Sequence, residues 1–303
     1  AALNHTFNAS AFTGNLTYTD GTLTGNTTLV SGGTGADVFT FTAASGSTGG
    51  LTNVDTINGG AGSDTINAVA TAASAFDNVT NVESIVLTGA ASAITTVEAL
   101  VAASTTLTVT AASATGALTF NGAAETDGGR FNVTGSAQAD ALTGGSASDT
   151  LSGGAGADTL VGGIGGDVLT GGAGADMFTY TTQAATISTV TNFDVISDFV
   201  FSDGDKIDVA ATGAVYQAGT ISGATLTIAV SAAITAATTA AGTNFDAAGD
   251  IVFFTYSGSV YGVINSNADA VLSANDTVLQ FASIVGNTGF STVGSLTVAD
   301  YAV

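Results

Sequence analysis

The stretch from Leu142 to Tyr180, LTGGSASDTLSGGAGADTLVGGIGGDVLTGGAGADMFTY, repeats one pattern every nine residues. Each repeat has a glycine pair, an aspartate four residues after it, and a large apolar residue two further on. Four copies stand in series over residues 144–179, and a degenerate copy, GSAQADALT, begins at Gly135. A fixed short period of this kind predicts a solenoid of stacked coils.

The same pattern returns upstream, where GGTGADVFT begins at Gly32 and GGAGSDTIN at Gly59, after a weaker copy, GLTNVDTIN, at Gly50. Short β-branched runs lie between the blocks: SIVLTG from Ser84, TLTVTA from Thr106, ALTFNG from Ala117, RFNVTG from Arg130 and DALTGG from Asp140. Such runs, each ending in a turn, indicate successive strands. We therefore expect an all-β fold, a parallel β-roll or β-solenoid over residues 22–180, preceded by an N-terminal segment, 1–21, and interrupted by a short helix at 94–103.

The glycine period stops after Tyr180, and the remaining sequence predicts different structure. Two apolar runs around SGS, in DIVFFTYSGSVYGVINSN from Asp250, predict a hairpin. The stretch SAAITAATTAAG from Ser231 predicts a short helix. Because the last coil of a solenoid would otherwise expose its core, we expect residues 181–303 to form a β-rich C-terminal cap.

The charge is almost wholly negative: 24 acidic residues face two basic ones, Arg130 and Lys206, for a formal net charge of −22. Because the chain lacks clustered Lys and Arg, we do not expect nucleic acid as a partner, and a metal cation is the better candidate to neutralise the negative charge. There is no cysteine, which excludes disulfides and thiolate metal sites. No apolar run reaches the roughly 18 residues of a membrane span.

The nonapeptide supplies the donors that a hard cation prefers. Its glycines permit positive φ, so that backbone carbonyl oxygens converge, and its aspartate adds a carboxylate. Ca²⁺ takes six to eight oxygens at about 2.3–2.6 Å and fits this set better than Mg²⁺. A metal-free alternative is that each aspartate caps its own turn through backbone hydrogen bonds. The apolar residues at position eight should point inward and stack: Leu142, Leu151, Leu160, Leu169 and Phe178.

GGAGADTLV at Gly153 and GGAGADMFT at Gly171 resemble the GGxGxDxUx repeat of the calcium-binding RTX (repeats-in-toxin) family. The resemblance implies a parallel β-roll with an ion between turns two repeats apart, pairing Asp149 with Asp167, Asp158 with Asp176, and Asp140 with Asp158. Ala147 replaces the fourth-position glycine, which makes the turn at Gly144 the weakest. The implied ligand residues are Asp140, Gly144, Asp149, Gly153, Gly156, Asp158, Gly162, Gly165, Asp167, Gly171, Gly174 and Asp176, with Asp37 and Asp64 in copies that lack adjacent strong copies.

The segment after the repeats also resembles this family, through DVISDF and DGDKID. The resemblance adds Asp198, Asp205 and Asp208 to the candidate calcium ligands; the alternative for these residues is a solvated acidic loop. The terminal ADYAV is similar to the end of type I secretion substrates, and VTNVESIVLTGA over 79–90 to the linking strands of RTX-type surface-layer proteins.

The sequence lacks the usual catalytic motifs. His5 is its one histidine, and neither HExxH nor GxSxG occurs, which excludes a metalloprotease of this family and argues against Ser/His catalysis. Paired carboxylates for glycoside cleavage stay open.

We predict a non-catalytic, calcium-dependent, self-assembling extracellular structural protein of the bacterial cell surface, a surface-layer or filament subunit. Its predicted partners are copies of itself in a lattice or filament, with a cell-surface polysaccharide as candidate anchor. The alternative is the C-terminal RTX portion of a secreted adhesin or hydrolase.

Overall fold

Strands are the main secondary-structure element in the computed structural model of the chain. The structure describes residues 5–20, 27–42, 51–69, 72–90, 92–180, 192–209, 215–220, 222, 225–240, 250–265, 276–282, 284–285 and 301–302. It divides into two units, Ala1–Asp158 and Thr159–Val303.

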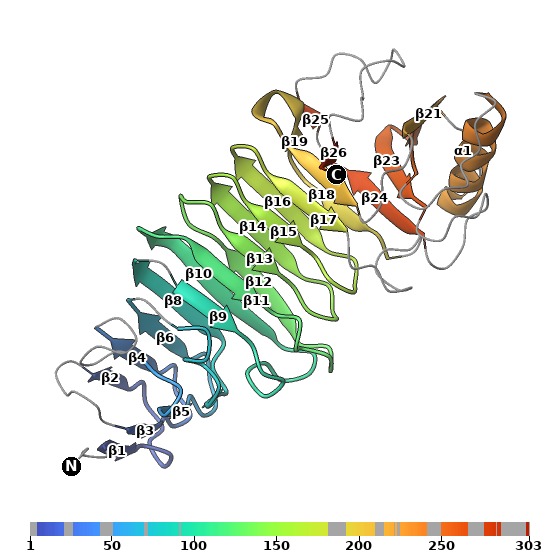
Figure 1. The fold of residues 1–303 in the computed structure, drawn as a ribbon. Helices are drawn as coiled ribbons and strands as arrows, with labels where there is room; N and C mark the ends of the chain where they lie inside the picture. The colour runs from blue at the N-terminus through green and yellow to red at the C-terminus, as the bar shows by residue number, and fades with distance from the viewer. Residues whose placement is uncertain are drawn as a thin grey trace. The chain divides into compact units, whose positions relative to one another are not determined.

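The first unit contains three parallel sheets. One consists of β1 (His5–Asn8), β3 (Thr28–Ser31), β5 (Thr56–Asn58) and β7 (Val79–Thr80). Another consists of β2 (Thr17–Asp20), β4 (Val38–Phe41), β6 (Thr65–Ala68), β8 (Ser84–Gly89), β10 (Thr106–Ala114), β12 (Arg130–Thr134) and β14 (Thr150–Ala155). The third consists of β9 (Ser92–Thr95), β11 (Leu118–Asn121) and β13 (Ala141–Thr143). Figure 1 shows these strands as successive coils, from β1 in blue to β14 in green.

Register places one apolar side chain of each coil on top of the next. In the longest sheet of the first unit the column is fully buried and consists of Phe39, Ile66, Ile85, Val109, Val133 and Leu151. Alternation along a strand sends the neighbouring polar residues outward. The all-β parallel roll is therefore confirmed, and the position-eight residues Leu142, Leu151, Leu160, Leu169 and Phe178 are all buried as predicted.

Two expectations differ from the structure at the N-terminal side. Parallel pairing already includes β1 and β2, so the stack contains residues upstream of residue 22, among them His5–Asn8. The helix expected over 94–103 is wrong: Ile94 and Thr95 end β9, and turns follow. The β-branched run Ile94 to Val97 has low helix propensity, and burial of Leu100 and Val101 holds the segment against the coil.

The second unit combines parallel coils with a mixed sheet. One sheet consists of β15 (Thr159–Val161), β17 (Met177–Tyr180), β20 (Lys206–Val209) and β26 (Tyr301–Ala302). A second consists, in order, of β16 (Val168–Ala173), β18 (Asp194–Ile196), β24 (Thr277–Phe281), β23 (Ser259–Ile264), β22 (Ile251–Tyr256) and β21 (Val215–Thr220). The described residues of this unit also form a short parallel pair, β19 (Phe199–Val200) with β25 (Ile284–Val285), and a 3-10 turn, η1 (Phe201–Asp203).

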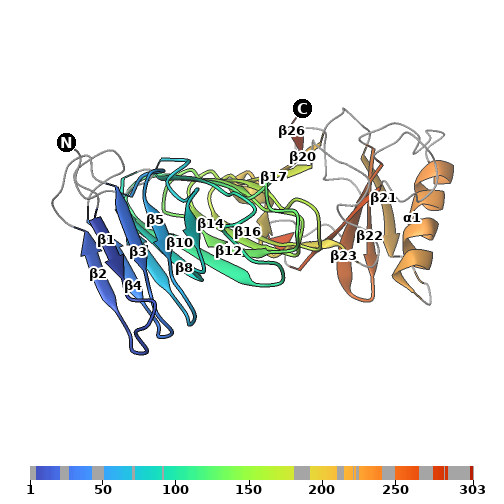
Figure 2. The ribbon, with the colours of Figure 1, turned by 90° about the horizontal axis from the view of Figure 1, so that it is seen from below.

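The hairpin and the helix predicted for this part are present. Strands β22 and β23 pair antiparallel around Ser257 and Gly258, whose φ values of 50° and 86° are those of a tight I′-type turn. Helix α1 (Leu226–Ala240) starts five residues before the predicted stretch and lies beside β21 and β22 (Figure 2). It packs Ala229, Val230 and Ala233 against the sheet residues Val252 and Phe254. Among the described residues, no helix has the length and apolar character that a membrane crossing requires.

Candidate calcium-binding turns

The aspartate of each nonapeptide ends a turn and directly precedes a strand. In the sequence D-x-apolar the apolar residue enters the core, so the aspartate, two positions earlier, lies on the same side of the chain. The carboxylates are accordingly buried rather than solvated: Asp37, Asp64, Asp140, Asp149, Asp158, Asp167 and Asp176 are at most 3% exposed.

Three of these carboxylates, those of Asp37, Asp140 and Asp149, accept a hydrogen bond from their own turn. Oδ2 of Asp37 accepts from the N–H of Gly33 at 2.8 Å, and Oδ2 of Asp149 from that of Gly145 at 2.7 Å. Asp140 accepts in the same way from Ser136, at 2.5 Å. The turn-capping role that the sequence left open is therefore present.

Within each unit, carboxylate oxygens also accept hydrogen bonds from the backbone of the preceding coil. The N–H of Asp140 donates to Oδ1 of Asp158 at 2.7 Å, and that of Phe131 to Oδ1 of Asp149 at 2.7 Å. In the second unit the N–H of Asp167 donates to Oδ1 of Asp194 at 3.0 Å. We call this series of carboxylates, each joined to the backbone of the coil before it, the aspartate ladder.

Asp37 and Asp64 belong to the ladder although their repeats are far apart in the sequence. The N–H of Asp37 donates to Oδ1 of Asp64 at 2.8 Å, across 27 residues. One coil is longer here than the 18 residues between Asp140 and Asp158. The view that these two aspartates lack a strong neighbour is therefore corrected, because neighbours in the stack need not be neighbours in the sequence.

Sequence reasoning missed Asp55 and Glu83 as members of the ladder, and it placed Asp194 only in the family-like segment DVISDF, without naming it as a ligand. Asp55 accepts from the N–H of Thr28 at 2.8 Å, Asp194 from Asp167, and Glu83 from the N–H of Asp64 at 2.7 Å. Each stands two positions before a buried apolar residue, in DTI, DVI and ESI. An acidic residue in this position, without any glycine requirement, was the signal that would have found them.

The acidic segment after the repeats is only partly joined to the ladder. Asp205 accepts from the N–H of Asp176 at 2.9 Å and from that of Val200 at 2.7 Å. Asp198 accepts from the N–H groups of Gly171 and Gly172, at 2.9 and 2.8 Å. Both therefore extend the last turn. Asp208 instead lies within β20 next to the buried Ile207, so alternation puts it on the outer face and apart from the ladder.

The glycines of the turn have two separate roles. The second- and fourth-position glycines adopt a left-handed backbone conformation. The φ values are 114° and 129° at Gly154 and Gly156, 102° and 143° at Gly163 and Gly165, and 106° and 134° at Gly172 and Gly174. The first glycine is needed for space: a Cβ at Gly153, Gly162 or Gly171 would overlap the carboxylate of Asp158, Asp167 or Asp176.

The turn at Gly144 departs from this conformation. Neither Gly145 nor Ala147 has a positive φ. Gly144 and Gly145 are buried, and a Cβ at Gly145 would lie 3.1 Å from the Glu125 side chain. The substitution Ala147, which led to the prediction of a weaker turn, thus coincides with a different backbone path.

Burial makes the charged form of these carboxylates unfavourable. It raises the pKa of Asp149 to about 6, although the Gly145 and Phe131 amides and Arg130 oppose the shift. It likewise raises the pKa of Asp205 to about 6, and it raises the pKa of Asp64. The pKa of Asp194 is well above its usual range because of burial and the nearby charge of Asp167. With two basic residues in the whole chain, the protein supplies little compensating charge.

A hard cation fits these turns. Oδ2 of Asp64 is buried and accepts no hydrogen bond from any residue that the structure describes. The Asp149 oxygens accept the N–H groups of Phe131 and Gly145, and a carboxylate oxygen that accepts a hydrogen bond can also coordinate a cation. Of the pairs implied by the resemblance, Asp140 and Asp158 are brought together. The pairs Asp149 with Asp167 and Asp158 with Asp176 each join the two units and stay predictions.

These features define a parallel β-roll whose turns present buried carboxylates and converging backbone to cations. The family model of the RTX calcium-binding nonapeptide repeat matches the chain in four copies, over residues 50–68 and 143–178. The chain therefore contains RTX repeats, which bind Ca²⁺ and are typical of secreted calcium-binding proteins. No curated protein matches it.

Proposed function

We propose that the protein is a non-catalytic structural protein that assembles with copies of itself outside the cell when calcium is bound. The proposed assembly is a surface-layer lattice or a surface filament. The observation that supports self-assembly best is the exposed aromatic residues and unpaired strand edges of β1 and β2 in the first unit.

Among the described residues, β1 and β2 carry a partly exposed aromatic layer over the core. Phe7 on β1 stacks above the fully buried Val30, and Tyr18 on β2 stacks above the fully buried Phe39. The Phe7 and Tyr18 rings approach each other, with centroids 5.9 Å apart. Phe7 is nevertheless 42% exposed, and Phe12, in the turn between the two strands, is 49% exposed.

The edges of these two strands are open as well. Within the described part of the chain, β1 pairs only with β3, and β2 only with β4. Soluble β-proteins usually block such edges with lysine or proline, but β1 (HTFN) and β2 (TYTD) contain neither. An apolar end bounded by unpaired backbone groups is suited to another β-roll.

Calcium would act as the switch for assembly. Sites of extracellular modules bind Ca²⁺ at about 10⁻⁴ to 10⁻³ M, so the turns would fill outside the cell and not in the cytosol. Bound ions would reduce the repulsion between copies of a chain that carries a net charge of −22. This chemistry supports an extracellular location at a bacterial surface, where a polysaccharide is the proposed anchor.

The alternative function is that of the C-terminal RTX portion of a secreted adhesin or hydrolase. The same open edges favour it, because further coils of a longer polypeptide would cover β1 and β2 equally well. The size of the native gene product separates the two functions.

Light scattering and electron microscopy of the purified chain test the proposal. In millimolar Ca²⁺ we expect ordered sheets or filaments that disperse when the ion is chelated. A protein that stays monomeric at high concentration and saturating Ca²⁺ would contradict self-assembly and favour the adhesin or hydrolase.

A further inference from the structure

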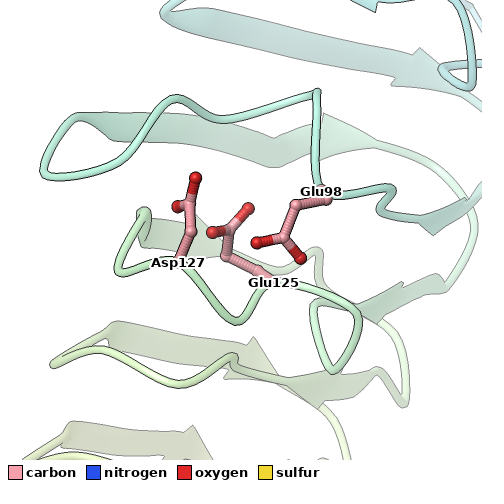
Figure 3. Close-up of side chains that lie close together, drawn as sticks. All are labelled: Glu98, Glu125 and Asp127. Atoms are coloured by element: carbon pink, nitrogen blue, oxygen red, sulfur yellow. The ribbon is translucent and has the colours of Figure 1, made fainter.

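Three carboxylates outside the nonapeptide repeats converge in the first unit. Glu98 lies in the turn after β9, and Glu125 and Asp127 lie in the turn after β11 (Figure 3). One oxygen from each lies within 4.8 Å of the other two. Glu98 and Asp127 are exposed, whereas Glu125 is fully buried.

The two turns are stacked one coil apart. Strands β9 and β11 are paired in parallel up to Thr95 and Asn121, and the N–H of Ser104 donates to the carbonyl of Gly128 at 3.1 Å. The next turn in the stack is the nonapeptide turn at Gly144, since the N–H of Ser146 donates to the carbonyl of Glu125 at 3.1 Å. The cluster is therefore continuous with a column of calcium-binding turns.

The aspartate ladder is interrupted at this level. Carboxylates immediately precede β4, β6, β8 and β14, at Asp37, Asp64, Glu83 and Asp149. The residues immediately before β10 and β12 are Thr105 and Gly129, and neither has a carboxylate. Glu98, Glu125 and Asp127 thus supply carboxylates to the two coils where the ladder does not.

Glu125 is the observation that indicates a ligand. Its Oε1 accepts from the N–H of Gly129 at 3.2 Å, but its buried Oε2 accepts no hydrogen bond from any described residue. Figure 3 shows its carboxylate between those of Glu98 and Asp127. A Cβ at Gly129 would lie 2.8 Å from Cγ1 of Val101 and 2.9 Å from Oε1 of Glu125, so the turn packs this closely only because residue 129 is a glycine.

The neighbours of Glu125 supply no positive charge. Burial, the Asp127 side chain and the charge of Glu98 raise the pKa of Glu125 to about 7. Glu98 is itself held in place, because the Thr126 hydroxyl donates to its carboxylate at 3.0 Å. A buried carboxylate between two others is costly unless a proton or a cation accompanies it.

We propose that Glu98, Glu125 and Asp127 bind one Ca²⁺ ion, at a site additional to those of the RTX repeats. All donors are oxygens, which suits a hard cation and not zinc or copper. Two oxygens that bind the same Ca²⁺ ion can lie up to about 5 Å apart, and the carboxylate oxygens of the cluster lie within 4.8 Å of one another. Two oxygens on one Mg²⁺ ion lie at most about 4 Å apart, in near-octahedral geometry. The site does not depend on the proposed self-assembly.

Calorimetric titration of the full chain with CaCl₂ tests the site, with three isosteric variants, Glu98→Gln, Glu125→Gln and Asp127→Asn. Asp77→Asn is the matched control, because Asp77 is exposed, lies outside both the ladder and the cluster, and loses the same charge. Glu98 and Asp127 are exposed, so their variants test the site even if Glu125→Gln fails to fold.

We expect each cluster variant to lose one Ca²⁺ equivalent, or to bind one ion at least about tenfold more weakly, while the other sites and the control are unchanged. Unchanged stoichiometry and affinity in Glu98→Gln and Asp127→Asn would overturn the proposal. An equal response of the wild-type site to MgCl₂ would overturn its assignment to calcium.

Discussion

The main-chain N–H of Asp140 donates a hydrogen bond to Oδ1 of Asp158, one coil further along the stack, at 2.7 Å. A single carboxylate thereby joins two coils while its charge remains available to an ion. Turn capping and calcium binding are therefore not exclusive roles, since each carboxylate oxygen can accept from an N–H and still coordinate a cation.

Two substitutions of Asp158 separate these roles. Asp158→Asn keeps an oxygen for the Asp140 N–H but removes the charge, whereas Asp158→Ala also leaves that buried N–H without its acceptor, at about 1–3 kcal/mol. We expect both to raise the calcium midpoint of folding, and Asp158→Ala to raise it further. Circular dichroism during a calcium titration measures this, with Asp77→Asn as control; midpoints equal to the control would contradict the ladder.

Chelation should remove most of the folded structure at neutral pH. Without Ca²⁺ the buried carboxylates of the ladder repel one another, and the binding free energy of the ions is therefore part of the folding free energy. We expect excess EDTA to abolish most of the β-signal in circular dichroism, and CaCl₂, but not NaCl at equal ionic strength, to restore it. An unchanged spectrum in EDTA would show that backbone hydrogen bonds stabilise the fold without Ca²⁺.

The calcium-free chain should respond to pH in the direction opposite to that of an ordinary acidic protein. Burial raises the pKa of Asp149 and of Asp205 to about 6, against about 3.9 in an unfolded chain. Their contribution to stability is then fully present below about pH 4 and is lost as the pH rises through about 6. In EDTA we expect the β-signal in circular dichroism to grow in magnitude, which indicates more folded chain, on acidification from pH 7.5 to 4.5.

With Ca²⁺ present the trend should reverse, because protons compete with the ion for the same carboxylates. Parallel pH titrations in EDTA and in saturating CaCl₂ measure both slopes, and Asp149→Asn should flatten both. If the β-signal changed with pH in the same direction in EDTA and in CaCl₂, buried carboxylates whose charge is compensated by an ion would be contradicted.

How much of this was accessible from sequence depends on distance along the chain. The contiguous repeats fix the position of Asp140 relative to Asp158, because a coil of two nonapeptides is 18 residues long. The coil from Asp37 to Asp64 is 27 residues long, and no local sequence pattern predicts the hydrogen bond between these two residues. Glu125 was not predictable either, because its burial results from the packing of two turns that carry no repeat.

The first glycine of the turn should be needed for calcium and not for backbone conformation. Gly153 lacks a positive φ, yet a Cβ there would overlap the Asp158 carboxylate. Gly258 is the matched control, because its φ is 86° and no atom lies within 4 Å of the added Cβ. We expect Gly153→Ala to raise the calcium midpoint, and Gly258→Ala to cost about 1–2 kcal/mol of strain at saturating calcium with little change in calcium affinity. Equal calcium affinities would refute the close-approach role.

The open edge of β1 should determine assembly. Phe7→Lys places a charge on an edge strand, which is how soluble β-proteins prevent edge-to-edge pairing. Because Phe7 is already 42% exposed at the end of the core, the variant should fold and bind Ca²⁺ as the wild type does. Leu29→Lys is the control: Leu29 is equally exposed, at 42%, but lies on β3, which is paired on both sides by β1 and β5.

We expect Phe7→Lys to remain monomeric in light scattering at millimolar Ca²⁺, while Leu29→Lys assembles like the wild type. Circular dichroism of both variants in Ca²⁺ verifies that the difference does not come from folding. If Leu29→Lys loses assembly and Phe7→Lys retains it, copies meet through the outer face of the sheet. The end of the β-roll would then not be the interface.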